Sequence, residues 1–414
     1  MRRAWVAAAA ASLLLAPAAP ALAGSAYGAP PTPAPSATTA PAASTASTTT
    51  PSPGTEGNFP QLTPAVATRL DAAVRSAMAE TRTPGVIVGL WAPGRGSYVR
   101  AFGVADKATG APMDPGLRMR IGSETKTFTV TALLRLVDRG KVRLDDAISG
   151  YVPGVPNGDR ITLRELAGMR SGLFNYSEDA DFNKVLDTEP RKPLAPQQLL
   201  DYAFRHPVRF QPGTRFEYSN TNLILLGLVV EKVTGRPLHD VITQDVLEPA
   251  GLHHTLFPTG AGFPEPHAHG YTGQATREVD ATDWNPSWAW AAGAMISDLQ
   301  DLRSWARTLA TGALLTPATQ AERLRTTPIG VPGAGYGLGV FDVQGWIGHN
   351  GSIPGYESLT VYLPQARATL VVLLNTDVLH DGKEPSAFFG EAVTAIATPD
   401  HVYPGHAPSA PKGG

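Results

Sequence analysis

Residues 121–140 read I-G-S-E-T-K-T-F-T-V-T-A-L-L-R-L-V-D-R-G and combine a helical pattern with two reactive side chains. Apolar residues at positions 130, 133, 134 and 137 recur at the spacing of one helix face. Gly140 is placed to end that helix in the left-handed conformation. Ser123 and Lys126 stand three residues apart at the start, so a helix brings the hydroxyl and the ammonium together. The first-turn N–H groups and the helix dipole favour negative charge at the same spot. The stretch therefore predicts a serine that attacks a carbonyl, a lysine that takes its proton and a helix end that stabilises the oxyanion.

The same residues also fit a plainer interpretation, in which Ser123 caps the helix and Lys126 points to water. The spacing Ser-x-x-Lys recurs at Ser409 to Lys412, in a Pro-rich tail that has no helical pattern. Taken alone, the spacing favours the helix cap, so the rest of the chain has to decide between the two interpretations.

The composition is that of a protein with a sizeable buried core. The chain has 414 residues, of which 43% are hydrophobic and 17% charged, enough for two to three domains or one large one. The formal net charge of −2 offers no basic surface and argues against nucleic acid as a partner. Because the sequence contains no cysteine, disulfides, thiolate metal sites and a cysteine nucleophile are excluded.

The first residues follow the pattern of a secretory signal. Arg2 and Arg3 precede an apolar run at residues 4–15, and Ala21-Leu22-Ala23 is a small-residue cleavage site, so residues 1–23 are expected to be removed. A membrane anchor is the alternative, but the run is short for a span. We therefore expect a secreted protein that keeps no membrane span after signal cleavage.

Low-complexity segments flank the part of the chain that we expect to fold. Residues 24–60 are mostly Ala, Pro, Ser, Thr and Gly with almost no charge, a composition that cannot bury enough surface to order itself. We interpret them as a disordered leader and residues 401–414 as a flexible tail. One folded domain is then expected at residues 61–400.

Strand patterns occur near both ends of this domain, and helical patterns fill the middle. Thr63-Pro64 and the box Thr162 to Glu165 are helix starts. The fold class expected is α+β: an antiparallel-dominated sheet built from both chain ends and flanked by helices, with an inserted helical domain at about residues 141–290. The expected strands are 86–91, 98–103, 336–343, 346–349, 358–363 and 369–374, and the expected helices include 64–80, 222–234, 298–309 and 386–397.

Two later triplets carry groups that can act in proton transfer. Tyr218-Ser219-Asn220 precedes a helix; its tyrosine can move a proton if cations lie close, and its asparagine can hydrogen-bond an amide. The alternative is a domain-edge tyrosine followed by a helix cap. His349-Asn350-Gly351 ends an expected strand, where His349 can carry a proton near neutral pH and Gly351 lets a substrate approach. The alternative is a surface hairpin turn.

Together and in this order, the three motifs resemble those of the penicillin-recognising serine hydrolases: D-alanyl-D-alanine carboxypeptidases, class C β-lactamases and related esterases. The motifs are Ser123-x-x-Lys126, Tyr218-x-Asn220 and His349-x-Gly351. The resemblance covers about residues 63–397 and extends to R-S-G-L at 170–173, H-A-x-G-Y at 267–271, S-W-A at 287–289 and G-Y-G-L-G at 335–339.

The resemblance implies two-step acyl transfer. Ser123 would be the nucleophile, Lys126 and Tyr218 would move its proton, and His349 would support the proton network. Substrate binding would involve Asn220, Gly351, Ser352 and Trp288, with the backbone N–H groups of Ser123 and Ser352 as the oxyanion hole. No cofactor is implied. We assign no metal, because the H-A-x-G-Y match favours a structural role for His267 and His269, and His253-His254 has no evident third ligand.

Two departures from the family pattern bear on the substrate. An arginine that would bind a substrate carboxylate is expected where this chain has Phe341, and a glutamine is expected where it has Pro354. The leading expectation is a D-alanyl-D-alanine carboxypeptidase. An esterase or β-lactamase on the same scaffold is the nearest alternative, and a non-catalytic peptidoglycan or β-lactam binding protein is another. The expected partners are a small peptide, ester or β-lactam, with a peptidoglycan stem peptide among them, and the protein is expected to be a monomer.

The nucleophile assignment predicts a single covalent adduct. A β-lactam or a fluorophosphonate should add to Ser123, and Ser123→Ala should abolish labelling while the melting temperature stays unchanged. Intact mass followed by peptide mapping is the measurement. An adduct mapped to Ser352 or Ser409 would contradict the assignment.

Overall fold

The computed structural model describes residues 59–274 and 277–405. The expected signal at residues 1–23, the leader up to residue 58 and the tail from residue 406 lie outside the described residues. Among the described helices, none is both long and apolar enough to cross a bilayer.

One large sheet joins the two ends of the folded chain. Within the described residues its nine strands run in the order β3-β2-β1-β13-β12-β11-β10-β9-β8, with every pairing antiparallel. Val88 of β1 lies opposite Val372 of β13, so the expected sheet from both chain ends is confirmed. The strands are β1 Gly85–Ala92, β2 Gly96–Asp106, β3 Ala111–Pro112, β8 Thr327–Pro328, β9 Ala334–Tyr336, β10 Phe341–Val343, β11 Trp346–Ile353, β12 Tyr356–Leu363 and β13 Ala368–Leu374.

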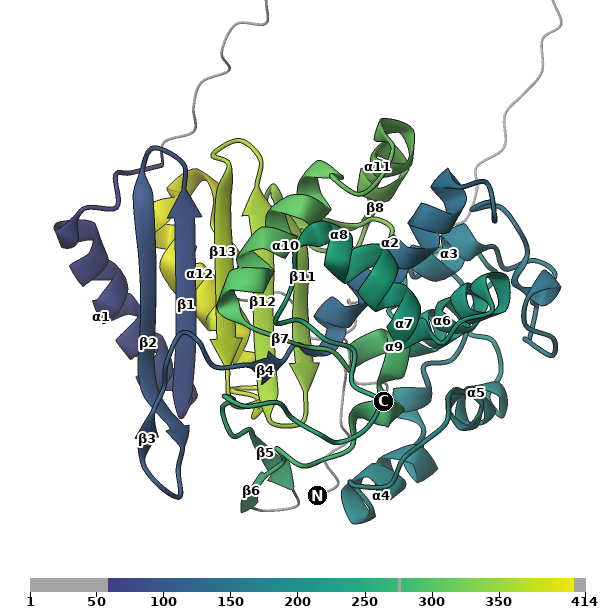
Figure 1. The fold of residues 1–414 in the computed structure, drawn as a ribbon, viewed down its shortest axis with the longest axis horizontal. Helices are drawn as coiled ribbons and strands as arrows, with labels where there is room; N and C mark the ends of the chain where they lie inside the picture. The colour runs from purple at the N-terminus through teal and green to yellow at the C-terminus, as the bar shows by residue number, and fades with distance from the viewer. Residues whose placement is uncertain (1–58, 275–276, 406–414) are drawn as a thin grey trace, which may run out of the picture.

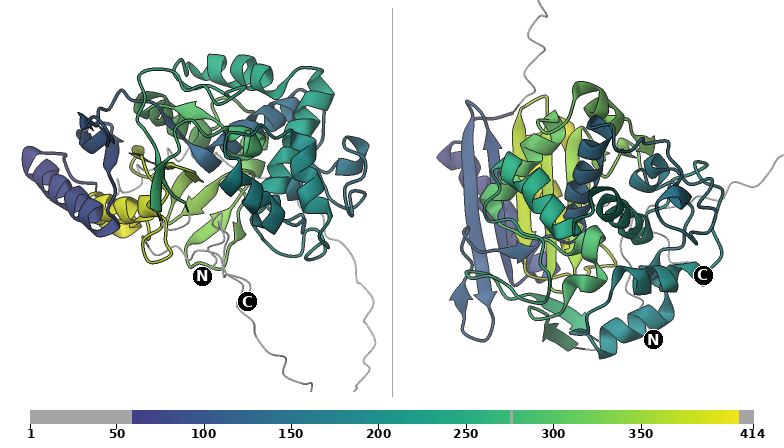
Figure 2. Two further views of the ribbon diagram at one scale, coloured as in Figure 1. Left: turned by 90° about the horizontal axis from the view of Figure 1, so that it is seen from below. Right: turned by 45° about the vertical axis from the view of Figure 1, so that its right-hand side comes forward.

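Helices cover both faces of the sheet, which explains why its central strands read as continuous apolar runs. Helices α1 (Pro64–Thr81) and α12 (Pro385–Ala397) pack together on one face, and α10 (Leu299–Thr311) crosses the other (Figures 1 and 2). In β1, Val86, Val88 and Leu90 face the α1–α12 side, and Ile87 faces the larger core on the other side.

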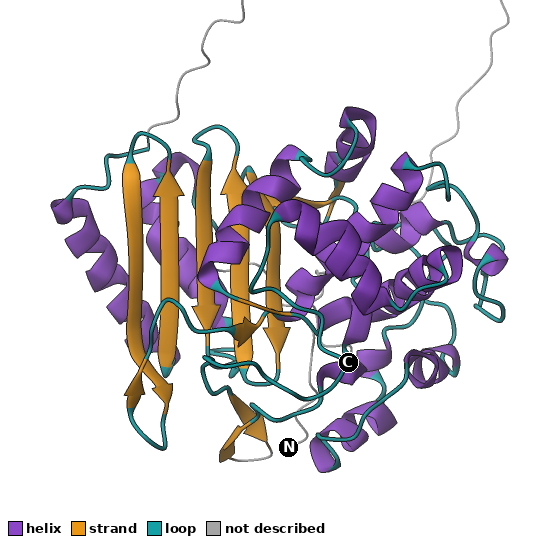
Figure 3. Cartoon of the chain, viewed as in Figure 1, coloured by secondary structure: helices purple, strands orange, loops and turns teal. Residues whose placement is uncertain are grey.

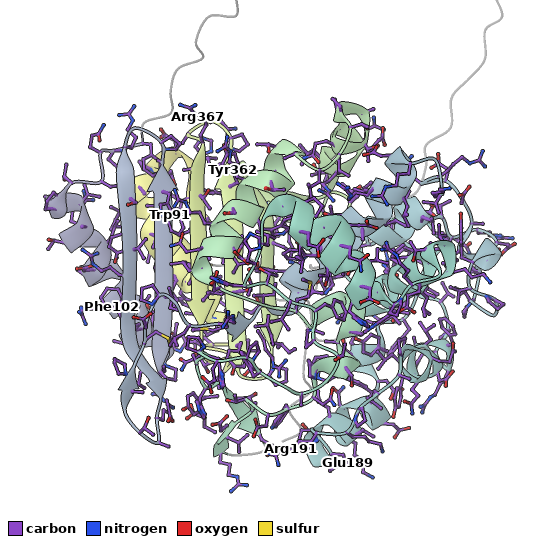
Figure 4. The ribbon with its side chains drawn as sticks, in the orientation of Figure 1. Trp91, Phe102, Glu189, Arg191, Tyr362 and Arg367 are labelled. Atoms are coloured by element: carbon purple, nitrogen blue, oxygen red, sulfur yellow. The ribbon has the colours of Figure 1, made fainter. Side chains whose placement is uncertain are left out.

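Two aromatic residues near the β1–β2 edge show how the two faces are closed (Figure 4). Arg303 of α10 lies over the ring of Trp91, with the guanidinium carbon 4.8 Å from the ring centroid. Arg75 of α1 lies over the ring of Phe102 at 4.6 Å. Each arginine thus lays its guanidinium group over an aromatic ring, which is a cation–π contact.

The middle of the chain is mainly helical and stands beside the β11 end of the sheet (Figure 3). Helix α2 (Thr125–Asp138) lies at its centre, and its residues 125–134 are all buried. The remaining helices are α3 Leu163–Ala167, α4 Ala180–Thr188, α5 Pro196–Phe204, α6 Asn220–Thr234, α7 Leu238–Ile242, α8 Glu248–Ala250, α9 Trp290–Gly293 and α11 Pro317–Leu324, and the small strand pairs are β4 Met119–Arg120 with β7 Ile296–Ser297 and β5 Tyr271–Gln274 with β6 Arg277–Asp280.

Local helix signals in the sequence were read correctly. Thr63 caps α1 with a proline at its first position, and Thr162 and Glu165 form the expected capping box. Gly140 has φ +64° just after α2, as its position predicted.

The late strands differ from the prediction in two places. Residues 336–343 are not one strand, because the chain reverses between β9 and β10 at Gly339, which has φ +70°. Strand β11 continues to Ile353, so His349 to Gly351 lie inside a strand and not at its end.

The folded domain also extends beyond its expected limits at residues 61 and 400. The side chain of Phe59 is buried against the α1–α12 face. Tyr403 is buried in the same core, and Trp346 Nε1 donates a hydrogen bond to the His401 carbonyl at 2.8 Å. One buried aromatic side chain thus attaches each of these two segments to the core.

Gly351 serves a purpose that the sequence did not indicate. A Cβ at this position would lie 1.9 Å from the carbonyl oxygen of Ile121, so β11 approaches the chain segment before Ser123 more closely than a side chain allows. In the direction that a Cβ would take, the space is filled by the protein's own backbone. The expected close approach of a substrate at the strand edge stays a prediction.

This contact predicts a large difference between two glycine substitutions. Gly351→Ala should destabilise the protein by about 1–3 kcal/mol through overpacking, because the atom it meets is backbone and cannot move aside cheaply. Gly150→Ala is the matched control, since a Cβ there meets nothing within 4 Å. Thermal or urea unfolding of both variants is the measurement, and equal stabilities would contradict the packing argument.

Candidate active site

Ser123 lies in the single turn (Gly122–Glu124) that leads directly into α2. Gly122 has φ +50°, and a Cβ on it would lie 2.6 Å from the backbone nitrogen of Ser352 on β11. This close approach sets the Ser352 N–H beside the Ser123 turn. The Ser352 backbone nitrogen thus lies close to the turn that carries Ser123. An oxyanion hole made by the N–H groups of Ser123 and Ser352 stays a prediction.

Lys126 meets Ser123 as the helical spacing predicted. Its Nζ lies 2.8 Å from Ser123 Oγ and 2.7 Å from the Ala292 carbonyl oxygen. The side chain is completely buried, and burial holds the pKa of the amine well below its usual value. A neutral amine can donate one N–H to Ala292 and accept the Ser123 proton with its lone pair.

Tyr218 lies beside both groups. Lys126 Nζ stands 4.8 Å from the centre of its ring. Burial raises the pKa of the Tyr218 phenol well above its usual value, Tyr336 raises it further, and a hydrogen bond with Ser123 works in the opposite direction. The phenol is therefore protonated at neutral pH, so it can hand on a proton but does not rest as a phenolate.

His349 differs from its expected state. Burial lowers the pKa of its imidazole to about 3, and the nearby Lys126 amine lowers it as well. Nδ1 donates to the Asn350 carbonyl, which leaves Nε2 to accept from the Tyr336 hydroxyl at 3.3 Å. His349 is thus a neutral imidazole with its one proton on Nδ1 and both nitrogens engaged, and it does not take up a second proton near neutral pH.

The orientation of Asn220 follows from its hydrogen bonds. Its backbone N–H donates to Asn175 Oδ1 at 3.1 Å, and that oxygen also accepts the Ser177 hydroxyl at 3.0 Å. Since the Ser177 proton is used, its oxygen must accept from Asn220 Nδ2, 3.1 Å away. In the described residues this leaves Asn220 Oδ1 without a protein partner and able to accept a hydrogen bond from a substrate N–H.

An aromatic wall, formed by Tyr218, Tyr336, Phe341 and His349, closes one side of the site. The Phe341 ring centre lies 4.7 Å from that of His349, 4.6 Å from that of Tyr336 and 6.4 Å from that of Tyr218, nearly parallel to the last. In the sequence, Tyr336 stands out only as part of G-Y-G-L-G. Its place in the aromatic wall is not predictable from the sequence, because its neighbours there come from β10, β11 and the segment before α6.

Trp288 is placed differently from the other candidates. The Tyr176 hydroxyl donates to its carbonyl at 2.7 Å, and its ring lies 5.8 Å from that of Phe182. The contacts found among the described residues therefore join Trp288 to the α4 side of the helical region, and a substrate role for it stays a prediction.

The other four catalytic candidates lie together in one cluster: Ser123, Lys126, Tyr218 and His349.

Three potential metal ligands meet away from this cluster. Ligand atoms of His254, Asp298 and Asp301 lie within 4.8 Å of one another. Asp301 Oδ2 already accepts from the backbone of His254 and Thr255 and from the Thr255 hydroxyl, and Asp298 Oδ1 caps α10. Hydrogen bonds from protein groups thus explain why these two carboxylates are buried here, and no ion is needed to explain it.

The family model described as Beta-lactamase matches residues 70–390. The chain belongs to the beta-lactamase family. A curated relative, "Putative penicillin-binding protein PbpX" of Bacillus subtilis (strain 168), is 25% identical over 67% of this chain, which spans 66% of that relative's length.

Two solved structures extend the comparison. A D-stereospecific amidohydrolase from Streptomyces sp. is 32% identical, with a TM-score of 0.71, over 80% of this chain and 97% of that one. The D-amino acid amidase from Ochrobactrum anthropi SV3, complexed with L-phenylalanine amide, is 28% identical, with a TM-score of 0.70, over 81% and 97%. The protein thus has the beta-lactamase-like fold that these two structures share.

A buried carboxyl group, that of Glu124, follows Ser123 directly in the sequence. Glu124 is 1% exposed, and burial raises its pKa to about 8. The hydroxyls of Ser358 and Thr360 on β12 lie near enough to lower the pKa in part, although neither reaches good hydrogen-bond geometry. Glu124 is therefore mostly protonated at neutral pH, and it loses its proton at the cost of burying a charge.

Glu124 predicts a stability that falls as pH rises. Its folded-state pKa is raised, so the folded state binds more protons than the unfolded state between about pH 4.5 and pH 8, and stability is lost across that window. Glu124→Gln, which cannot ionise, should match the wild type near pH 4.5 and become the more stable protein toward pH 8. Unfolding curves at several pH values are the measurement, with the exposed Glu80→Gln as control. Parallel pH profiles for wild type and Glu124→Gln would contradict the assignment.

Proposed function

We propose that this protein is an exported serine amidohydrolase that forms an acyl-enzyme at Ser123 and acts on D-configured amides, peptides or esters with an uncharged leaving end. The aromatic wall carries the proposal, because it stands where a carboxylate-binding arginine was expected. The similarity to a D-stereospecific amidohydrolase and to a D-amino acid amidase supports an amide substrate and a D-configured residue in it. The signal pattern of residues 1–23 supports export.

In the proposed acylation, Lys126 takes the Ser123 proton as Oγ attacks the substrate carbonyl carbon. The new C–O bond places negative charge on the carbonyl oxygen, which the N–H groups of Ser123 and Ser352 stabilise. When the C–N bond breaks, the leaving nitrogen receives a proton from Tyr218, which is replenished from Lys126. Water then attacks the ester by the reverse route and releases the acid.

The charge distribution favours a neutral leaving end. His349 is neutral with both nitrogens engaged, and Phe341 offers no donor. An arginine binds a carboxylate through two parallel charge-assisted hydrogen bonds, and one such bond is worth roughly 1.5–3 kcal/mol net. A free carboxylate that binds at the aromatic wall would lose its hydration without gaining hydrogen bonds from an arginine.

A D-alanyl-D-alanine carboxypeptidase is the second candidate, favoured by the similarity to a penicillin-binding protein. An esterase or β-lactamase would use the same groups with a different substrate. A non-catalytic binding protein is disfavoured, because binding alone does not need a buried amine 2.8 Å from a serine hydroxyl.

The substrate proposal predicts how the wild type, Phe341→Arg and Phe341→Leu differ in their preference between a free acid and its amide or ester. The wild type should hydrolyse a D-alanyl-D-alanine peptide amide or ester at least as efficiently as the free acid, judged by kcat/KM. Phe341→Arg should raise kcat/KM for the acid selectively, by about tenfold or more, which corresponds to roughly 1.4 kcal/mol. Phe341→Leu is the control, since it opens space without adding charge. A wild-type preference for the free acid above tenfold would favour the carboxypeptidase instead.

A further inference from the structure

The turn that follows Trp288 holds an unfavourable backbone conformation. Trp290, the first residue of α9, has φ +33°, a region that side chains with a Cβ avoid. A residue in this region is strained and persists only where its surroundings impose the conformation. The turn also carries Ala291 and Ala292, whose carbonyl groups face α2.

Gly227 in α6 accommodates the Trp290 ring. A Cβ at Gly227 would lie 2.7 Å and 2.9 Å from two atoms of the Trp290 six-membered ring, and 2.8 Å from the Cβ of Ala291. Glycine inside a helix is less stable than alanine at the same position. At this position α6 thus gives up helix stability and leaves a notch that the indole fills.

Three side chains of α2 bind the segment after the indole. Thr129 Oγ1 donates to the Ala291 carbonyl at 2.8 Å, Lys126 Nζ donates to the Ala292 carbonyl at 2.7 Å, and Thr125 Oγ1 accepts from the Met295 N–H at 3.0 Å. The turn therefore docks on α2 at fixed points. The middle one is the amine that faces Ser123.

We propose that Trp290, seated in the Gly227 notch, is a positioning residue that holds the Ala292 carbonyl on Lys126 Nζ and thereby directs the amine lone pair at Ser123. The inference rests on the proposed role of Lys126 as the base. Without the ring the turn relaxes toward an ordinary φ, and the carbonyl turns away. The amine then loses one fixed hydrogen bond and, with it, its orientation.

The test follows covalent labelling of Ser123 by a fluorophosphonate, with the labelling rate constant and the final labelled fraction measured separately by intact mass. Trp290→Ala should lower the rate constant at least tenfold while labelling still goes to completion. Gly227→Ala, which closes the notch but keeps the ring, should act in the same direction. Trp290→Phe, which keeps a ring, should recover the rate constant to within about threefold of wild type.

Trp91→Ala is the matched control, because Trp91 is a buried tryptophan on β1, far along the sheet from β11. It should lose stability without any change in the labelling rate constant. A merely structural role for Trp290 predicts that same result for Trp290→Ala: fewer labelled molecules at the wild-type rate constant. That outcome overturns the inference. If Trp290→Ala does not fold, Gly227→Ala and Trp290→Phe decide by the same criterion.

The pH profile of the rate constant gives a second readout. The Ala292 carbonyl stabilises the charged amine, so its loss moves the acid limb of the Trp290→Ala profile to lower pH by about one unit. Tyr218 and His349, which also face Lys126, are unchanged in this variant. An acid limb that stays in place counts against the proposal.

Failure of the proposed function is recognised separately. If the wild type is not labelled at Ser123, or if Lys126→Ala is labelled at the wild-type rate constant, the function itself is wrong. If both of these controls behave as expected and Trp290→Ala reacts like the wild type, only the positioning role is wrong.

Discussion

A buried amine governs the arrangement of this site. Lys126 is the second residue of α2 and has no exposed surface, and among the described residues no carboxylate forms an ion pair with it. Removing an ammonium group from water without a counter-ion is so costly that the group gives up its proton instead. The neighbours of Lys126 fit a neutral amine. The Ala292 carbonyl can accept one N–H, the Ser123 hydroxyl can donate its proton to the amine lone pair, and the Tyr218 ring centre lies 4.8 Å from Nζ.

The environment of this amine is built by close backbone contacts. Gly122 and Gly351 let the turn before α2 lie directly on β11, which brings the Ser352 N–H to the serine. Strand β11 is itself held by β12 along its length and, at its start, by β10. The sheet thus supplies a rigid edge, and the helical region supplies the nucleophile, the amine and the tyrosine.

The sequence predicted what is encoded locally. Helical spacing, a following glycine and a capping box were sufficient for α2, its end at Gly140 and the start of α3. The three motifs were sufficient for the cluster of Ser123, Lys126, Tyr218 and His349. Features that arise from contacts between distant segments could not be predicted from the sequence. The neutral state of His349 depends on burial and on Tyr336, the need for Gly351 depends on the approach of Ile121, and the burial of Phe59 and Tyr403 depends on a core shared by both chain ends.

The pairing of β1 with β13 has a consequence for how the molecule comes into being. Val88 meets Val372, so the centre of the sheet joins segments from opposite ends of the folded chain. During synthesis β1 emerges long before its partner, and β11, which carries the Ser352 N–H, emerges later than α2. A ribosome that has finished the helical region therefore holds a chain in which Ser123 and Lys126 do not yet have β11 beside them. The dominance of long-range pairings makes folding slow and leaves strand edges uncovered until the last segment arrives. The contact between the Ser123 turn and β11 can therefore form only after most of the chain has been made.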